Sequence, residues 1–194
     1  MRKILLYIIF FCFSVNASSQ ITQGNWLIGG NISYVKNNSE GTDATNSKSR
    51  EISVSGNIGY FPFSKFATGL LLNTDLSKAK YPRENGPNDV STQNSFGGGV
   101  FARYYFLKEE NRVNLFTDEG VIFSSLKVKN SGVQTGDEFN TLDYYLSAGT
   151  VIFLNTSVGA EFIVSYNRSK AYKFDSRAES LQFKIGLQFH LEKE

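Results

Sequence analysis

Apolar and polar side chains alternate along most of the chain, and the final segment shows the alternation most completely. Its apolar positions share one parity: Leu181, Phe183, Ile185, Leu187, Phe189 and Leu191. The other parity holds Ser180, Gln182, Lys184, Gly186, Gln188 and His190. Successive side chains of a β-strand point to opposite faces, whereas a helix would distribute these apolar positions around its circumference. The segment is therefore predicted to be a strand with one apolar face and one polar face.

Seven earlier segments repeat this alternation. In each of them the apolar side chains occupy every second position, and the segments comprise residues 26–34, 52–60, 66–72, 96–106, 113–123, 144–152 and 158–166. We therefore expect eight strands of about 10 to 14 residues. A strand that crosses a bilayer at a tilt needs about 9 to 11 residues, whereas strands of soluble sheets usually have about 5 or 6. The expected lengths favour strands that cross a membrane.

The connections between these segments alternate in length. The short ones are residues 61–65, 107–112 and 153–156. The long ones are polar and comprise Lys36–Arg50, Leu76–Gln93, Lys127–Asn140 and Arg168–Arg177. Short turns at one end and long loops at the other are typical of the periplasmic and extracellular ends of membrane barrels. With an even number of strands, both termini are expected on the short-turn side.

A sheet that crosses a membrane has to close into a barrel, because hydrocarbon contains no water to satisfy open edges. The sequence therefore predicts an all-β protein, an eight-stranded antiparallel up-and-down transmembrane β-barrel. Eight strands enclose a narrow interior that side chains fill. The charged residues of the polar parity are predicted to form a salt-bridge network there: Glu51, Arg103, Asp118, Glu161 and Lys184. A soluble lipocalin-like barrel is the alternative, but its outer face would be polar.

Two features concern the predicted outer face. Aromatic residues gather near both ends of the strands, as the two aromatic girdles of a membrane barrel do. Those beside the short turns are Tyr60, Phe61, Phe63, Phe66, Tyr104, Tyr105, Phe106 and Phe153. Glu119 falls on the lipid-facing parity, where a charge near the bilayer midplane is unfavourable. We expect a bulge at Asp118–Gly120 that shifts the register; the alternative is that Glu119 faces a partner subunit.

The first residues have the pattern of a secretory signal peptide. Arg2 and Lys3 are followed by the apolar run Ile4–Phe13 and then by small polar residues. The run is too short to span about 30 Å of hydrocarbon as a helix. We expect cleavage after Ala17 or after Ser19, which gives a signal peptide over residues 1–19 and a barrel domain over residues 20–194.

Cleavage would change the chemistry of the mature chain. The single cysteine, Cys12, lies in the apolar run, so neither a disulfide nor thiol chemistry is expected after cleavage. Loss of Arg2 and Lys3 reduces the 20 basic residues to 18, which equals the 18 acidic residues. A chain without net charge has no basic field to attract nucleic acid.

Roughly residues 23–191 resemble, in pattern more than in identity, the small outer-membrane β-barrel family of the OmpA/OmpX-like, eight-stranded kind. The stretch Gly97–Phe106 looks like the fourth strand of that family. The end of the chain resembles the signal that the barrel-insertion machinery reads, carried here by Lys184, Gly186, Phe189 and Leu191. It departs from the family pattern because its last position is a leucine and not an aromatic residue, and because residues 192–194 follow it.

The resemblance implies an integral protein of a Gram-negative outer membrane with both termini in the periplasm. The expected partners are outer-membrane lipid and lipopolysaccharide and, during biogenesis, periplasmic chaperones and the barrel-assembly machinery. Basic residues of the last long loop are candidate lipopolysaccharide contacts: Arg168, Lys170, Lys173 and Arg177. Hydrogen bonds from such residues to phosphate are charge-assisted. The alternative is that these are ordinary solvated loop charges.

No pattern in the sequence is typical of a catalytic or metal site, and we expect a non-enzymatic protein without a cofactor. His190 is the only histidine, so a mature chain without cysteine excludes a His/Cys metal site. The Gly97–Gly99 run lacks the Lys-Ser/Thr of a phosphate loop. The leading hypothesis is a structural or surface-interaction protein with a plugged polar lumen. The alternatives are a lipid-modifying enzyme that uses His190 and a narrow, low-conductance channel.

Overall fold

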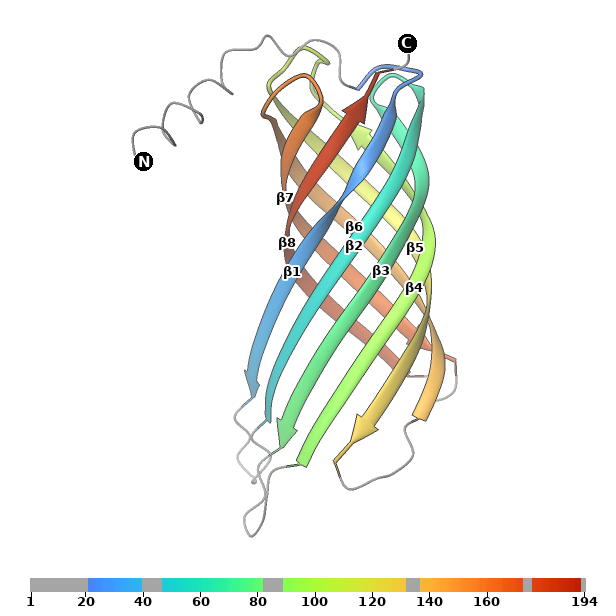
Figure 1. The fold of residues 1–194 in the computed structure, drawn as a ribbon, viewed down its shortest axis with the longest axis vertical. Helices are drawn as coiled ribbons and strands as arrows, with labels where there is room; N and C mark the ends of the chain where they lie inside the picture. The colour runs from blue at the N-terminus through green and yellow to red at the C-terminus, as the bar shows by residue number, and fades with distance from the viewer. Residues whose placement is uncertain (1–20, 40–46, 82–88, 132–136, 173–175, 193–194) are drawn as a thin grey trace, which may run out of the picture.

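The computed structural model describes residues 21–39, 47–81, 89–131, 137–172 and 176–192. Over these residues the chain forms one closed antiparallel barrel in which each strand pairs with its neighbours in sequence (Figure 1). The strands are β1 (Trp26–Ser39), β2 (Ser47–Phe63), β3 (Phe66–Tyr81), β4 (Asp89–Tyr105), β5 (Val113–Asn130), β6 (Asp137–Phe153), β7 (Val158–Ala171) and β8 (Ser176–Leu191). The predicted all-β, eight-stranded up-and-down barrel is confirmed. The predicted signal peptide at residues 1–19 lies outside the described residues.

The two faces of the barrel wall differ as the alternation predicts. On β8, Phe183 is 70% exposed and Ile185 is 60% exposed, whereas Gln188 and His190 are fully buried. Each of the other strands also exposes large apolar side chains on its outer face. An apolar outside around a polar interior is the arrangement of a transmembrane barrel and the reverse of a lipocalin-like one. None of the described residues forms a helix long and apolar enough to cross a membrane.

The strands are longer than predicted, and the four long connections are correspondingly shorter. Strand lengths run from 14 residues in β1 to 18 in β5. Most of Lys36–Arg50, expected as a loop, is strand, because Lys36 pairs with Arg50 and Ser39 with Ser47. The other three long connections are likewise mostly strand. These segments carry polar side chains on both faces, so the period-two signal fades while backbone pairing continues. The prediction of long loops is wrong.

The barrel closes through β1 and β8, but only over half of its height. We call the end where β1 begins and β8 ends the turn end, and the opposite end the open end. The β1–β8 register runs from Trp26 opposite Leu191 to Ser33 opposite Lys184. Beyond it, the described residues of these strands pair only with β2 and β7. Ala178 has interior parity and is exposed there, where it lines the polar cavity.

Local backbone features let the strands turn and curl tightly. Lys65, in the connection between β2 and β3, has a φ of 68°. Short hairpin connections need such left-handed residues because the turn has to match the twist of the strands. Along β4, a Cβ at Gly99 would overlap the carbonyl oxygen of Val121 on β5. The glycine run Gly97–Gly99 lies in β4, and Gly97 and Gly99 let β4 and β5 approach closely.

Glu119 lies on the outer face of β5 without a bulge. It pairs with Ala102 of β4 and Leu146 of β6 in an unbroken register. Within the described sheet, the register shifts instead between Tyr60 and Phe63, beside the β2–β3 turn. Because the alternation continues through Glu119, its exposed side chain faces the lipid. The predicted bulge is wrong, and a contact with a partner subunit stays a prediction.

Replacing Glu119 by Leu should raise the free energy of unfolding by on the order of 1 kcal/mol, because a carboxylate leaves the apolar belt. Val113 and Phe123 are the exposed apolar residues toward either end of β5, and Glu119 lies between them. The measurement is urea unfolding in lipid vesicles, followed by the fluorescence of Trp26, the single tryptophan.

Glu138→Leu is the matched control. Glu138 is exposed near the open end of β6, opposite Lys127 of β5. A charge at the membrane interface has little effect on stability, so this variant should unfold like the wild type. Loss of stability in Glu119→Leu, together with a smaller oligomer in sedimentation, would instead show that Glu119 binds a partner subunit.

Candidate functional site

The barrel interior is filled at distinct levels along its axis. An aromatic and apolar plug occupies the turn end, and a cluster of buried charged residues adjoins it. A polar cavity extends from this cluster toward the open end. Each level is built from interior-parity side chains of several strands, so the levels depend on closure of the barrel.

Arg103 on β4 is the centre of the charged level. Its Nη1 lies 2.5 Å from Oε1 of Glu161 on β7, and its Nη2 lies 2.6 Å from Oδ2 of Asp118 on β5. The Nε group donates a further hydrogen bond of 3.0 Å to Asp118 Oδ2. Arg103 and Asp118 are direct partners in the β4–β5 register, so their contact is local. Since β7 does not adjoin β4, the contact with Glu161 bridges the lumen.

Neutral polar groups hold the two carboxylates from other strands. The Tyr145 hydroxyl donates to Asp118 Oδ1 at 2.9 Å, and Gln188 Nε2 donates to Glu161 Oε2 at 3.4 Å. The side-chain amides of Gln188 and Asn57 bond to each other at 3.0 and 3.3 Å. The network therefore ties six strands together across the interior, from β2 and from β4 through β8.

Two of the predicted network residues lie outside this cluster. Lys184 has its Nζ 5.6 Å from the ring centre of Tyr145, and no described carboxylate lies within ion-pair distance of it. Glu51 lies in the polar cavity and accepts hydrogen bonds from Ser53 and Gln182. The predicted network is thus too large. Parity places all its members inside the barrel, but their different heights along the strands separate them.

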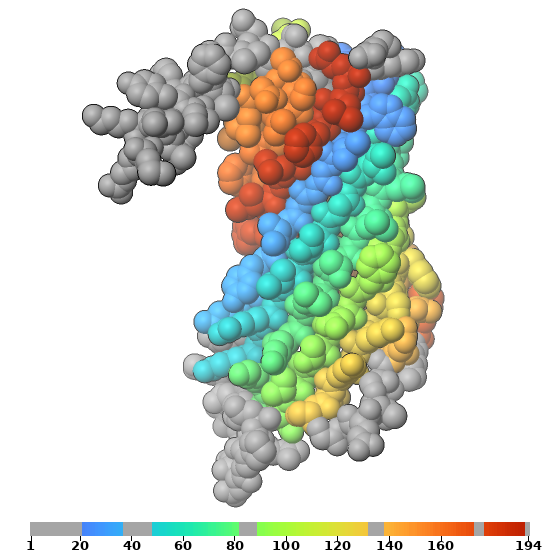
Figure 2. Space-filling view, in the orientation of Figure 1, coloured from blue at the N-terminus to red at the C-terminus, as the bar shows by residue number. Residues whose placement is uncertain are grey.

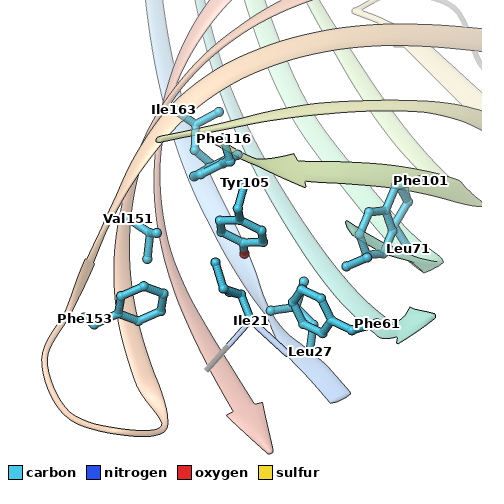
Figure 3. Packing of buried hydrophobic residues seen from close by; sticks show 11 residues of the cluster. Ile21, Leu27, Phe61, Leu71, Phe101, Tyr105, Phe116, Val151, Phe153 and Ile163 are labelled. Carbon is cyan, nitrogen blue, oxygen red and sulfur yellow. The ribbon is translucent and has the colours of Figure 1, made fainter. Parts of the chain in front are cut away.

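Aromatic rings block the lumen between the charged level and the turn end (Figure 3). Phe61, Tyr105, Phe116 and Phe153 are all buried in this plug. The ring centres of Tyr105 and Phe116 are 5.7 Å apart. The guanidinium carbon of Arg103 lies 4.2 Å from the ring centre of Phe116. The plug and the charged cluster are therefore continuous, and together they close the lumen.

The segment that precedes β1 seals the plug from the turn end. Ile21 is fully buried among the plug residues (Figure 3). The backbone nitrogen of Lys65 donates to the Ile21 carbonyl at 2.8 Å, and that of Gly24 donates to the Phe61 carbonyl at 2.9 Å. These bonds fix the segment to the β2–β3 turn.

From the sequence, Phe61, Tyr105 and Phe153 are expected in an outer aromatic girdle, and the structure places them inside. Each has the interior parity of its own strand, so the alternation already contained the correct assignment. Their sequence neighbours Tyr60 and Tyr104 do lie on the outer face. Proximity to a short turn does not distinguish a girdle residue from a plug residue, whereas parity does, except at Phe63, which is exposed beside the register shift of β2.

His190 is enclosed by the same plug. Its side chain is fully buried, with its ring centre 5.3 Å from that of Phe153 and 6.1 Å from that of Phe61. Its Nε2 lies 3.5 Å from the Tyr105 hydroxyl, and its Nδ1 has no hydrogen-bond partner among the described residues. A general base needs a substrate within reach of its nitrogen, and here the surrounding rings occupy that space.

The polar cavity has a volume of about 350 Å³. Arg103 and Asp118 contribute to its lining on the side of the charged level. Its acidic residues nearer the open end are held by neutral donors, as in the bond of 2.7 Å from Asn73 to Asp75. No group of three or more metal-ligating side chains is arranged to hold an ion in the part of the chain that the structure describes.

The remaining predicted site residues lie on β7, on β8 and between them. Arg168, Lys170 and Arg177 are exposed near the open end, and Lys173 lies outside the described residues. The residues of the predicted insertion signal divide between the faces of β8. Lys184 and Gly186 face the interior, whereas Phe189 and Leu191 are exposed on the outer face.

Replacing Arg103 by Met should lower the free energy of unfolding by about 3 to 5 kcal/mol, because two buried carboxylates lose their cation. Replacing all three charged residues, as in Arg103→Met/Asp118→Leu/Glu161→Leu, should recover most of this loss, because no buried charge is then unpaired. Urea unfolding in vesicles measures both variants.

The exposed pair Lys127–Glu138, 3.5 Å apart, provides the control. The double variant Lys127→Met/Glu138→Leu should change the free energy of unfolding by less than about 1 kcal/mol, as is usual for exposed ion pairs. If Arg103→Met were as stable as this control, the charged cluster would have no structural role.

No protein-family model and no curated protein matches the sequence. Solved structures with a similar fold include the outer membrane protein OprG from Pseudomonas aeruginosa, with a TM-score of 0.57 at 10% identity, covering 93% of this chain and 100% of that one. Neisserial surface protein A (NspA) gives a TM-score of 0.51 at 13% identity, covering 86% and 97%. The chain therefore has the fold of the small eight-stranded outer-membrane β-barrels.

Proposed function

We propose that the protein is a non-enzymatic integral β-barrel of a Gram-negative outer membrane with a structural or surface-interaction role. The observation that carries this proposal is the closed lumen, in which the Arg103 cluster and the aromatic plug lie one behind the other. A barrel closed in this way interacts through its outer face and its open end, and not by conducting solutes. Its expected partners are outer-membrane lipid and lipopolysaccharide.

The exposed apolar outer face supports the membrane location. On β3, the apolar face runs from Phe66 to Leu76. At about 3.3 Å per residue and a tilt of about 40°, this length covers about 25 Å of the bilayer normal, which is the height of the apolar band of outer-membrane barrels. A water-soluble protein that exposed such a belt would aggregate.

The proposed orientation has the turn end in the periplasm. The turn end carries the shortest connection, residues 64–65, and the open end carries the outward basic residues of β7 and β8. The insertion signal on β8 ends at the turn end, where periplasmic chaperones and the barrel-assembly machinery would engage it. The open end then meets the lipopolysaccharide leaflet.

Membrane fractionation combined with a heat-modifiability gel tests the location. The chain should be recovered with the outer membrane and should migrate as a compact band until it is boiled, because a closed barrel resists detergent. Recovery in the soluble periplasm, without a mobility shift on boiling, would refute the proposal.

Planar-bilayer recording tests the narrow-channel alternative. The wild type should show no conductance steps, and Arg103→Ala should stay closed because the rings of Phe61, Tyr105 and Phe153 still block the lumen. Before recording, Arg103→Ala is run on the heat-modifiability gel, where a compact band shows that the variant is folded. Steps in the wild type that Arg103→Ala enlarges or abolishes would establish a channel.

Replacement of His190 by Ala tests the enzyme alternative. What supports a non-enzymatic role is that His190 is enclosed by Phe61, Tyr105 and Phe153. Lipid extracted from cells that express either form should have the same composition by mass spectrometry. A lipid change that requires the wild-type chain and is absent with His190→Ala would show that the barrel is an enzyme.

A further inference from the structure

Basic side chains occupy the outer face of β1, β2 and β3 near the open end. These three strands lie side by side on the face of the barrel shown in Figure 2. The basic residues all have the outward parity and are all exposed: Lys36, Lys48, Arg50, Lys78 and Lys80. We call them the β1–β3 cluster.

The register brings these like charges directly opposite one another. Arg50 is paired with Lys36 on one side and with Lys78 on the other. Lys48 is paired with Lys80 in the next outward row. Like charges directly opposite on neighbouring strands repel. The cluster therefore favours an anion that neutralises several of its members at once.

No described acidic residue offsets these charges. None of the cluster residues forms an ion pair with a carboxylate in the described ranges. The outward β4 partner of Lys78 is Thr92, and that of Lys80 is Val90. The sheet itself thus supplies no counter-charge to the cluster.

Two of the other described basic residues near the open end have acidic neighbours. Lys127 on β5 lies 3.5 Å from Glu138 on β6. Arg168 on β7 lies 3.7 Å from Glu179 on β8. Acidic side chains therefore offset part of the positive charge on β5 to β8, whereas no described acidic side chain pairs with the β1–β3 cluster.

The cluster begins where the apolar belt ends. Tyr34, Ile52 and Leu76 form an exposed outward row across β1, β2 and β3. The row of Lys36, Arg50 and Lys78 follows two residues further along each strand. Two residues of a tilted strand rise by about 5 Å along the bilayer normal. The cationic groups therefore lie at the level of lipid headgroups, above acyl chains that contact the belt.

We propose that the β1–β3 cluster binds the phosphate groups of anionic lipid in the leaflet around the open end. Lysine and arginine stems lie along apolar surface while their cationic ends reach the headgroup region. Arginine binds phosphate through paired, charge-assisted hydrogen bonds, so Arg50 at the centre of its row is the principal contact. This site differs from the β7–β8 residues expected from the sequence, and it rests on the proposed membrane location.

The test measures which lipid the full-length barrel selects. The purified chain is inserted into phosphatidylcholine bilayers that contain trace spin-labelled phosphatidylglycerol or phosphatidylcholine, and spin-label spectra give their relative association with the protein. The wild type should prefer phosphatidylglycerol several-fold, and salt should weaken the preference. The variant with Gln at all five positions of the cluster should lose most of it.

A second variant matches this loss of charge elsewhere on the rim. It carries Gln at the five other described basic residues near the open end: Lys127, Lys129, Arg168, Lys170 and Arg177. It should keep most of the preference for phosphatidylglycerol. If both variants lose the preference equally, net charge and not the β1–β3 cluster attracts the lipid, and the proposal is wrong.

Further controls distinguish a lipid headgroup from a soluble anion. They also distinguish failure of the lipid site from failure of the proposed membrane location. Millimolar inorganic phosphate should reduce the preference no more than sodium chloride of equal ionic strength; a specific effect of phosphate would overturn the proposal in favour of a soluble anion. A chain that does not insert contradicts the proposed membrane location, whereas one that inserts without preference contradicts only the lipid site. If the five-residue variant does not fold, Lys36→Gln/Lys78→Gln is compared with Lys127→Gln/Lys129→Gln. The first double variant should weaken the preference for phosphatidylglycerol, and the second should keep it.

Discussion

Every backbone amide and carbonyl of a chain in hydrocarbon needs an internal partner, because lipid offers none and each unsatisfied group costs several kcal/mol. In this protein each strand pairs with its neighbours, and β1 joins β8 from Trp26 to Ser33. Closure then separates an outside from an inside, so one parity of every strand meets lipid and the other meets the interior. The apolar belt, the plug and the charged cluster all depend on that separation.

Eight strands leave an interior that is narrow enough for side chains to fill. Charged groups are stable there only in pairs, since an isolated buried charge is strongly unfavourable. Arg103 meets this condition by contacting Asp118 from the adjoining strand and Glu161 from across the lumen. The rings toward the turn end exclude water from the other side. Because two adjoining layers close the lumen, the interior serves to hold the barrel together, and interactions with other molecules fall to its outer face and open end.

The charged residues of the outer face are distributed unevenly, both along the barrel axis and around the circumference. Glu119 lies within the apolar belt of β5, whereas the cations of β1, β2 and β3 begin above the row of Tyr34, Ile52 and Leu76. A charge is unfavourable in the first position and favourable in the second, because the surroundings change from acyl chains to headgroups. The cations of β1, β2 and β3, which form no ion pair with a described carboxylate, give this side of the barrel a distinct face toward its lipid neighbours.

The sequence by itself determined the number of strands, their antiparallel order and the face on which nearly every side chain lies, because alternation is a local property of an extended backbone. It also contained the inward parity of Phe61 and Tyr105, although their position beside short turns suggested a girdle. Only the tertiary structure decided where the strands end, that Glu119 stays in register, and that Glu161 and not Glu51 meets Arg103. Those outcomes depend on strand tilt and on the stagger between distant strands, which fix the height of each residue in the barrel. Parity within one strand carries no information about height.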